Sequence, residues 1–184
     1  MTVIAAVVNE NGSYIAGDRG ASDDNIILPL AHPKVWQIGQ YLFGYYGSMD
    51  GEKVMYNFDP PVPTAAQRKN IDKFMGNDFT KALKDFYDEH FVFTAEKECD
   101  FGMIIIAEGR MYEHDAGTMS MTRFETDYLS VGSGSEYAYG SLYSTQVWSD
   151  GKKRVRIAIE AATKYSPSCM QPIDVISIPR KEIK

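Results

Sequence analysis

Three residues near the start of the chain have the types and spacing for nucleophilic catalysis: Thr2, Asp18 and Lys34. A threonine hydroxyl is almost never ionised near neutral pH, so it needs a base, and the α-amine of the same residue can serve. The reference pKa of an α-amine, about 8, lets it accept a proton. This chemistry requires Thr2 to be the first residue, and a small second residue such as threonine permits removal of Met1.

A short β-hairpin is expected to bring Asp18 close to Thr2. Residues 3–8 are rich in β-branched side chains, and an Asn-Gly turn precedes the returning strand at 13–16. Lys34 begins the next expected strand. A lysine beside the α-amine would lower the pKa of that amine and stabilise negative charge on the hydroxyl oxygen, and an aspartate would orient the lysine. By itself, the same pair is also compatible with an ordinary ion pair.

Other chemistries lack their sequence signatures. The chain has no dinucleotide-binding or P-loop glycine motif in the right context, no HExxH and no GxSxG. Its three histidines, His32, His90 and His114, are widely separated. We therefore expect no metal site and no cofactor.

Composition indicates one globular domain over residues 1–184. Hydrophobic residues make up 44% and charged residues 24%, and the net charge is -6. Nucleic acid is an improbable partner, because phosphate binding needs clustered Lys and Arg. The basic cluster at 152–154, with Arg156, has helical spacing and is typical of a solvated helix face.

The sequence also favours a cytoplasmic protein without membrane contact. Cys99 and Cys169 form neither a disulfide framework nor a CxxC pair, which suits a reducing compartment. No signal peptide is visible, and the longest apolar run, 103–107, is too short to span a bilayer.

The remaining elements follow from periodicity and turn chemistry. A stripe of Phe79, Ala82, Leu83, Phe86, Tyr87 and His90 predicts a core-packing helix that begins near 77 or 78, with His90 as a structural residue. The proline-rich stretch 59–63 ends the helix expected at 51–58, and no element is assigned to residues 64–76. The other expected helices are 51–58, 136–147 and 153–164, and the other strands are 34–38, 41–46, 101–107, 111–115, 123–125, 128–131 and 173–178. Because strand blocks alternate with helix pairs, we expect two antiparallel sheets covered by helices.

Several segments, in order along the chain, resemble proteasome β subunits and their bacterial ATP-dependent relative. The opening MTVIA, the stretch IAGDRGAS at 15–22 and PKV at 33–35 resemble the start of such subunits. FGYYGSMD at 43–50, VGSGSEYAYG at 131–140 and PIDVISI at 172–178 resemble later segments. The spacing from Thr2 to Asp18 and Lys34 matches the family's catalytic Thr, Asp and Lys.

The resemblance implies an α+β fold, a four-layer αββα sandwich of the N-terminal nucleophile hydrolase type. It implies Gly44 as the backbone N–H donor of an oxyanion hole and Ser133 as a hydroxyl supporting Thr2. Ser22 and Gly47 are expected at the substrate groove, where Ser22 would hold the peptide backbone and Gly47 is the second candidate for the N–H donor.

The chain departs from the family after its last long helix. There Ser166 stands where the family usually has an aspartate that supports the nucleophile, and Cys169 stands where a serine is usual. Both are expected to be supporting residues.

The function implied is a threonine-type endopeptidase in a homo-oligomeric ring that encloses its active sites. Such a ring would cleave polypeptides supplied by an ATPase or another regulator. Two alternatives remain open: a non-catalytic subunit of the same fold, and an amidase of the wider class that acts on small amides.

Overall fold

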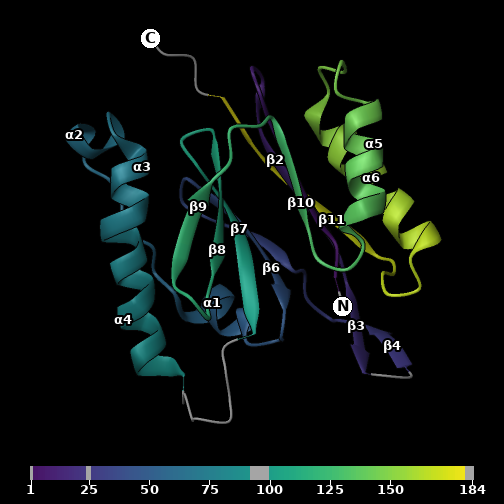
Figure 1. The fold of residues 1–184 in the computed structure, drawn as a ribbon, viewed down its shortest axis with the longest axis horizontal. Helices are drawn as coiled ribbons and strands as arrows, with labels where there is room; N and C mark the ends of the chain where they lie inside the picture. The colour runs from purple at the N-terminus through teal and green to yellow at the C-terminus, as the bar shows by residue number, and fades with distance from the viewer. Residues whose placement is uncertain (1, 24–25, 92–99, 181–184) are drawn as a thin grey trace.

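The computed structural model describes residues 2–23, 26–91 and 100–180, which form four layers in the order helices, sheet, sheet, helices (Figure 1). The predicted αββα sandwich is thus confirmed. None of the helices in these ranges is long and apolar enough to span a membrane.

One sheet carries the start of the chain at its centre. It has the order β10-β1-β2-β11, and all its pairings are antiparallel. Its strands are β1 (Ile4–Asn9), β2 (Gly12–Asp18), β10 (Tyr128–Val131) and β11 (Ile173–Pro179). The helices α5 (Ser135–Ser144) and α6 (Gly151–Tyr165) cover its outer face (Figure 1).

The second sheet is an antiparallel meander in the order β5-β6-β7-β8-β9. Its strands are β5 (Val35–Ile38), β6 (Tyr41–Gly47), β7 (Phe101–Ala107), β8 (Arg110–Asp115) and β9 (Ser120–Arg123). Its outer face is covered by α1 (Gly51–Asn57), α3 (Ile71–Phe74), a π-helical segment (Met75–Phe79) and α4 (Thr80–His90), with α2 (Ala65–Arg68) beside them. A separate hairpin of β3 (Gly20–Asp23) and β4 (Ile26–Pro29) follows β2.

Apolar side chains fill each of the three spaces between layers. Ile4, Ile15 and Leu42 belong to the cluster between the sheets, because successive side chains along a strand point to opposite faces of its sheet. The cluster under α4 is rich in aromatic rings, and Phe79 and Tyr87 lie within it. The predicted stripe therefore packs in the core, although His90 itself is exposed and stacks on Phe86 with ring centroids 4.4 Å apart.

Two predictions about surface residues had different outcomes. Lys152, Lys153 and Arg156 are exposed on α6, as the basic cluster predicted. Arg154 is only 2% exposed, so the prediction of a solvated face was wrong for this residue. The thiol of Cys169 is free and buried, whereas Cys99 lies outside the described residues.

Candidate active site

Thr2 lies just before the inner strand β1, at the end of the sheet that adjoins the β10–α5 connection. It is 3% exposed, and its carbonyl accepts a hydrogen bond from the backbone N–H of Gly134 at 3.2 Å. Gly132 has a φ of +90°, and a Cβ atom there would lie 2.3 Å from the Thr2 carbonyl oxygen. Glycine is required at this position for both reasons, and it allows the loop to close over the backbone of Thr2.

The ammonium of Lys34 lies directly beside the Thr2 hydroxyl. Lys34 Nζ is 2.9 Å from Thr2 Oγ1 and 3.0 Å from Asp18 Oδ1, and it also donates to the carbonyl of Gly20. Lys34 immediately precedes β5, and its side chain is 1% exposed. Each of the three donors of the ammonium thus has an acceptor, which fixes the position of its charge.

Asp18 orients this lysine from the end of β2. The hairpin register pairs Ile4 with Gly17, so the backbone N–H of Val3 reaches Asp18 Oδ1 at 3.0 Å. Asp18 Oδ2 accepts from the backbone N–H groups of Gly20 at 2.9 Å and Met170 at 3.2 Å. The carboxylate is fully buried, and these bonds compensate for the loss of water around its charge.

Burial dominates the electrostatics of the site. It lowers the pKa of Lys34, while the neighbouring Asp18 opposes that effect. Burial also raises the pKa of the Cys169 thiol, and the negative charge of Asp18 adds to that rise. Lys34 thus places a poorly solvated cation beside a hydroxyl oxygen, an arrangement that favours an alkoxide on Thr2.

A chain of serine hydroxyls approaches the nitrogen of Thr2. Thr2 N donates to Ser133 Oγ at 3.2 Å, and Ser133 Oγ lies 2.9 Å from Ser168 Oγ. Ser168 Oγ lies 2.7 Å from Ser166 Oγ, so Ser168 joins two predicted residues. Ser168 was missed in the sequence, although its position between Ser166 and Cys169 was a usable signal.

Cys169 supports the site by packing. It is 5% exposed, and a Cβ atom on Gly134 would lie 2.5 Å from its sulfur. Its sulfur is 3.8 Å from Ser168 Oγ. Cys169 therefore holds the loop of Ser168 against the loop that covers Thr2.

The two glycines of β6 occupy different environments. Gly44 is buried in mid-strand, and a Cβ atom there would lie 2.8 Å from a methyl group of Ile4 and 3.0 Å from one of Ile15. Close packing of the sheets therefore accounts for glycine at this position. Gly47 is exposed at the end of the strand, and Ser22 is partly buried in β3. Their roles toward an oxyanion or a substrate stay predictions.

An αββα sandwich with a threonine at the start of a central strand and a buried lysine beside it defines the N-terminal nucleophile hydrolase type of fold. By sequence, the chain matches no protein-family model and no curated protein.

By structure, the chain is similar to two solved proteins of the proteasome family over nearly its whole length. One is Thiobacillus denitrificans BPH in complex with epoxomicin, with a TM-score of 0.74 and 16% identity, covering 98% of this chain and 100% of that chain. The other is HslV from Trypanosoma brucei, with a TM-score of 0.70 and 21% identity, covering 97% of this chain and 99% of that chain. The fold of this chain is therefore the proteasome-type fold, as the sequence resemblance implied.

Proposed function

We propose that this chain is a threonine-type peptidase in which Thr2 attacks peptide bonds after the Met1–Thr2 bond has been cleaved. The contact of 2.9 Å between Lys34 Nζ and Thr2 Oγ1, two buried side chains, carries this proposal. An ordinary ion pair would need only Lys34 and Asp18. Here the lysine also donates to the hydroxyl, which supports a catalytic role.

The nitrogen of Thr2 would act as the base once it is a free amine. It would take the hydroxyl proton while Oγ1 attacks the substrate carbonyl, and Ser133 would hold the amine in place. A backbone N–H, from Gly44 or Gly47, would stabilise the oxyanion. Water activated by the same amine would then release the acyl group from Thr2.

Intact-mass spectrometry tests this proposal directly. We expect the purified protein to lack the mass of Met1 and to gain one inhibitor mass when treated with a threonine-directed epoxyketone or β-lactone. Peptide mapping should place the adduct on Thr2. Thr2→Ala should form no adduct, whereas Thr2→Ser should still form one because serine keeps the hydroxyl.

A different outcome would favour a second function, that of a non-catalytic subunit with this fold. The observation behind this alternative is that Ser166, at the family's aspartate position, supplies a hydroxyl and no charge. Met1 fully retained, with no adduct on Thr2, would contradict the peptidase proposal and leave this alternative.

A further inference from the structure

The hydroxyl chain that leads from the nitrogen of Thr2 to the end of α6 carries no charge. Ser133 Oγ accepts from Thr2 N at 3.2 Å, and Ser168 Oγ lies 2.9 Å from Ser133 Oγ and 2.7 Å from Ser166 Oγ. Ser166 and Ser168 are 7% and 6% exposed, so little water reaches this end of the chain. On this side, the nitrogen of Thr2 is therefore bound by a neutral dipole.

The charges closest to Thr2 belong to Lys34 and Asp18, which form a pair without net charge. Lys34 Nζ lies 2.9 Å from Thr2 Oγ1, whereas Asp18 Oδ1 lies 3.0 Å from that ammonium and accepts from the backbone N–H of Val3. Cys169 is the titratable group of the loop after α6, and burial raises the pKa of its thiol, which keeps it neutral. The site therefore supplies no excess negative charge that would favour a protonated amine.

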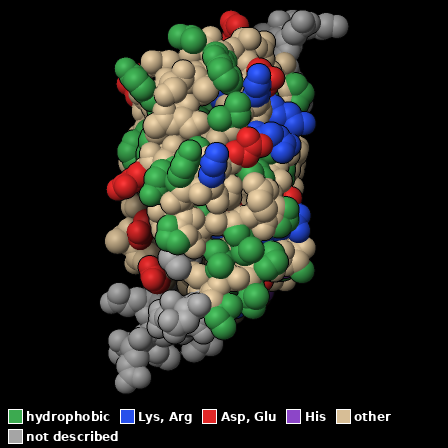
Figure 2. Space-filling model, turned by 90° about the vertical axis from the view of Figure 1, so that its right-hand side faces the viewer, with side chains coloured by type: hydrophobic (Ala, Val, Ile, Leu, Met, Phe, Trp, Pro, Cys, Tyr) green, Lys and Arg blue, Asp and Glu red, His purple; other side chains and the backbone are tan. Residues whose placement is uncertain are grey.

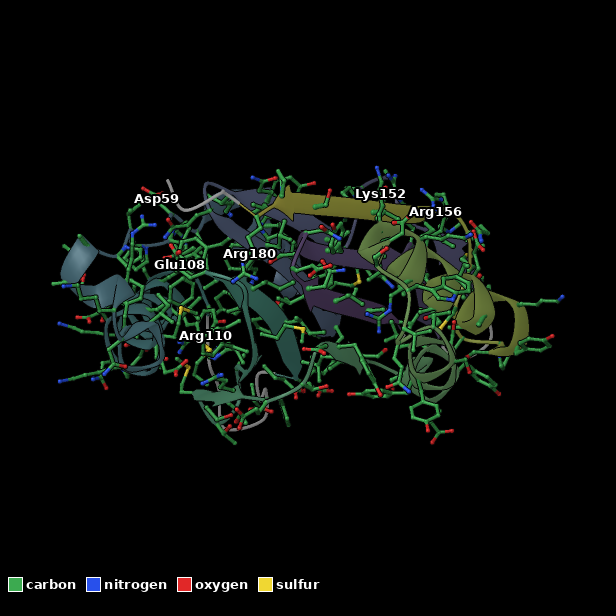
Figure 3. All side chains as sticks on the ribbon, turned by 90° about the horizontal axis from the view of Figure 1, so that it is seen from above. Asp59, Glu108, Arg110, Lys152, Arg156 and Arg180 are labelled. Carbon is green, nitrogen blue, oxygen red and sulfur yellow. The ribbon has the colours of Figure 1, made fainter. Side chains whose placement is uncertain are left out.

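The other charged residues of the surrounding elements do not change this balance. Figure 3 labels two basic residues of α6, Lys152 and Arg156, in the first half of the helix, whereas Ser166 follows its last residue. Arg156 and Ser166 are ten residues apart, which is about 15 Å at roughly 1.5 Å per residue. On the elements next to Thr2, the charged residues are exposed or joined in one ion pair: Glu136, Lys164, Arg19 and Asp174.

A free amine at Thr2 would therefore be buried beside a cation. Burial disfavours the protonated form of an amine, because that form is charged, and a nearby cation disfavours it further. Both effects lower the pKa of the amine from its ordinary value of about 8. The same burial lowers the pKa of Lys34. The serine hydroxyls oppose these effects only as dipoles.

We propose that the uncharged end of this chain, at Ser166, keeps the amine of Thr2 unprotonated in mildly acidic solution, so that the peptidase stays active below neutral pH. This inference rests on the proposed function and concerns how pH regulates the same site. Ser166 acts through Ser168 and Ser133, and a negative charge in its place would restrict activity to higher pH.

The rate at which a threonine-directed β-lactone acylates Thr2, measured by intact-mass spectrometry at several pH values, tests this inference. The acid limb of the second-order rate constant reports the base of the free enzyme. For the unmodified protein, we expect the midpoint of this limb below about pH 7. Ser166→Asp should raise the midpoint by about one pH unit, the effect of a unit charge three hydrogen-bond lengths away at an effective dielectric constant of about 20. Ser166→Asn, similar in size but uncharged, is the matched control and should keep the midpoint of the unmodified protein.

Circular dichroism shows whether Ser166→Asp is folded. If it is not, Ser133→Asp, at an exposed position beside Thr2 N, should raise the midpoint relative to Ser133→Asn. Equal midpoints in the aspartate and asparagine variants, or a midpoint above about pH 7 in the unmodified protein, would overturn this inference and leave the peptidase proposal intact. A protein that forms no adduct at any pH would contradict the proposed function, and this inference with it.

Discussion

At the scale of single residues, Lys34 joins the parts of the candidate active site. One ammonium contacts the hydroxyl of Thr2, the carboxylate of Asp18 and the carbonyl of Gly20. A compact ammonium can place three donors toward three acceptors, whereas a planar guanidinium cannot place them in the same way. The position of the charge should therefore matter more than its presence.

Replacement of Lys34 is predicted to abolish peptide hydrolysis. Lys34→Ala removes the cation beside Thr2 Oγ1, and loss of one such electrostatic contact costs about 10²–10³ in kcat. Lys34→Arg should not restore activity. The fold should survive in Lys34→Ala because three backbone N–H groups still bind Asp18. Peptide hydrolysis and circular dichroism, measured together, check this, and near-normal activity in Lys34→Ala would remove Lys34 from the mechanism.

Ser168 is predicted to position the nucleophile through Ser133. Ser168→Ala breaks the hydroxyl chain to Ser166 and should lower kcat roughly tenfold, the effect of about 1.4 kcal/mol, with little change in KM. Ser130 provides a matched control, because it is similarly buried and its hydroxyl donates to the carbonyl of Ile4 at 2.8 Å. Ser130→Ala loses one buried hydrogen bond, and Ser168→Ala loses the two that its hydroxyl makes with Ser133 and Ser166. Equal activity in Ser168→Ala and Ser130→Ala would mean that Ser168 has only a structural role.

The position of a single residue could be predicted from the sequence only where a local signal, such as a turn or a helical spacing, indicated it. Asp18 could be placed beside Thr2 because a β-hairpin fixes which residues of its two strands face each other. Arg154 was misplaced because its charge suggested solvent. Its spacing was informative, since it lies four residues before Ala158 on the apolar face of α6.

At the scale of elements, the missed helices show which signals were overlooked. Residues 59–76 contain α2 and α3, and α2 begins with a capping box in which Thr64 and Gln67 bond each other's backbone. The Thr-x-x-Gln pattern is present in the sequence and could have predicted the start of this helix. Helix α4 continues from α3 through the π-helical segment, in which Met75 and Phe79 are buried. No periodicity of 3.6 residues could predict that wider turn.

Strand ends were harder to predict where a turn uses an unusual residue. The strand expected at 123–125 lies at Ser120–Arg123, because Met119 adopts a φ of +57° and closes the turn early. Asp115 fixes that turn by accepting from the backbone N–H of Thr118 at 2.7 Å. A methionine in the left-handed region carries no sequence signal. The β3–β4 hairpin was also missed.

His114 holds α4 against the second sheet and should make stability depend on pH. Its Nδ1 lies 2.8 Å from the Ser120 carbonyl, so this nitrogen carries the proton, and Nε2 lies 3.1 Å from the Tyr87 hydroxyl. Burial lowers the pKa of His114 from 6.5 to about 4, although Ser120 and Asp115 oppose the shift. The unfolded chain therefore binds the proton first as the pH falls.

The contribution of His114 to stability is complete above the unfolded pKa of 6.5 and is lost as the pH falls toward 4. The loss should approach about 1.4 kcal/mol per pH unit within that window. Urea unfolding at several pH values checks this. His114→Gln keeps a donor and an acceptor but does not titrate, so its stability should fall less steeply. Identical slopes in the two proteins would contradict this assignment.

At the scale of the whole molecule, the four-layer arrangement leaves two helical layers exposed on opposite sides. The order of strand blocks and helix pairs predicted two antiparallel sheets covered by helices, and the family resemblance supplied the four-layer sandwich. The outer surfaces could not be predicted in the same way. Figure 2 shows the face of α5 and α6, on which groups of hydrophobic side chains lie among charged and other surface atoms. Its exposed apolar residues are Tyr137, Tyr139, Tyr143, Val147, Trp148 and Tyr165.

These residues lead to our last prediction, that copies of the chain associate through the α5–α6 face. Val147 is 86% exposed and Tyr143 is 64% exposed, and several large exposed apolar side chains on one face favour an interface. The peptidase proposed here would need its sites enclosed, and a closed ring satisfies every repeated contact, whereas an open arrangement continues into filaments. Light scattering should therefore give a mass many times 20.7 kDa.

Val147→Asp should reduce that mass, because it buries an unpaired charge at the contact. Val62→Asp is the matched control, since Val62 is 72% exposed beside the opposite helical layer. A stable monomer over a wide concentration range would contradict the enclosed peptidase and favour a hydrolase of small amides, and equal loss of mass in both variants would place the contact elsewhere.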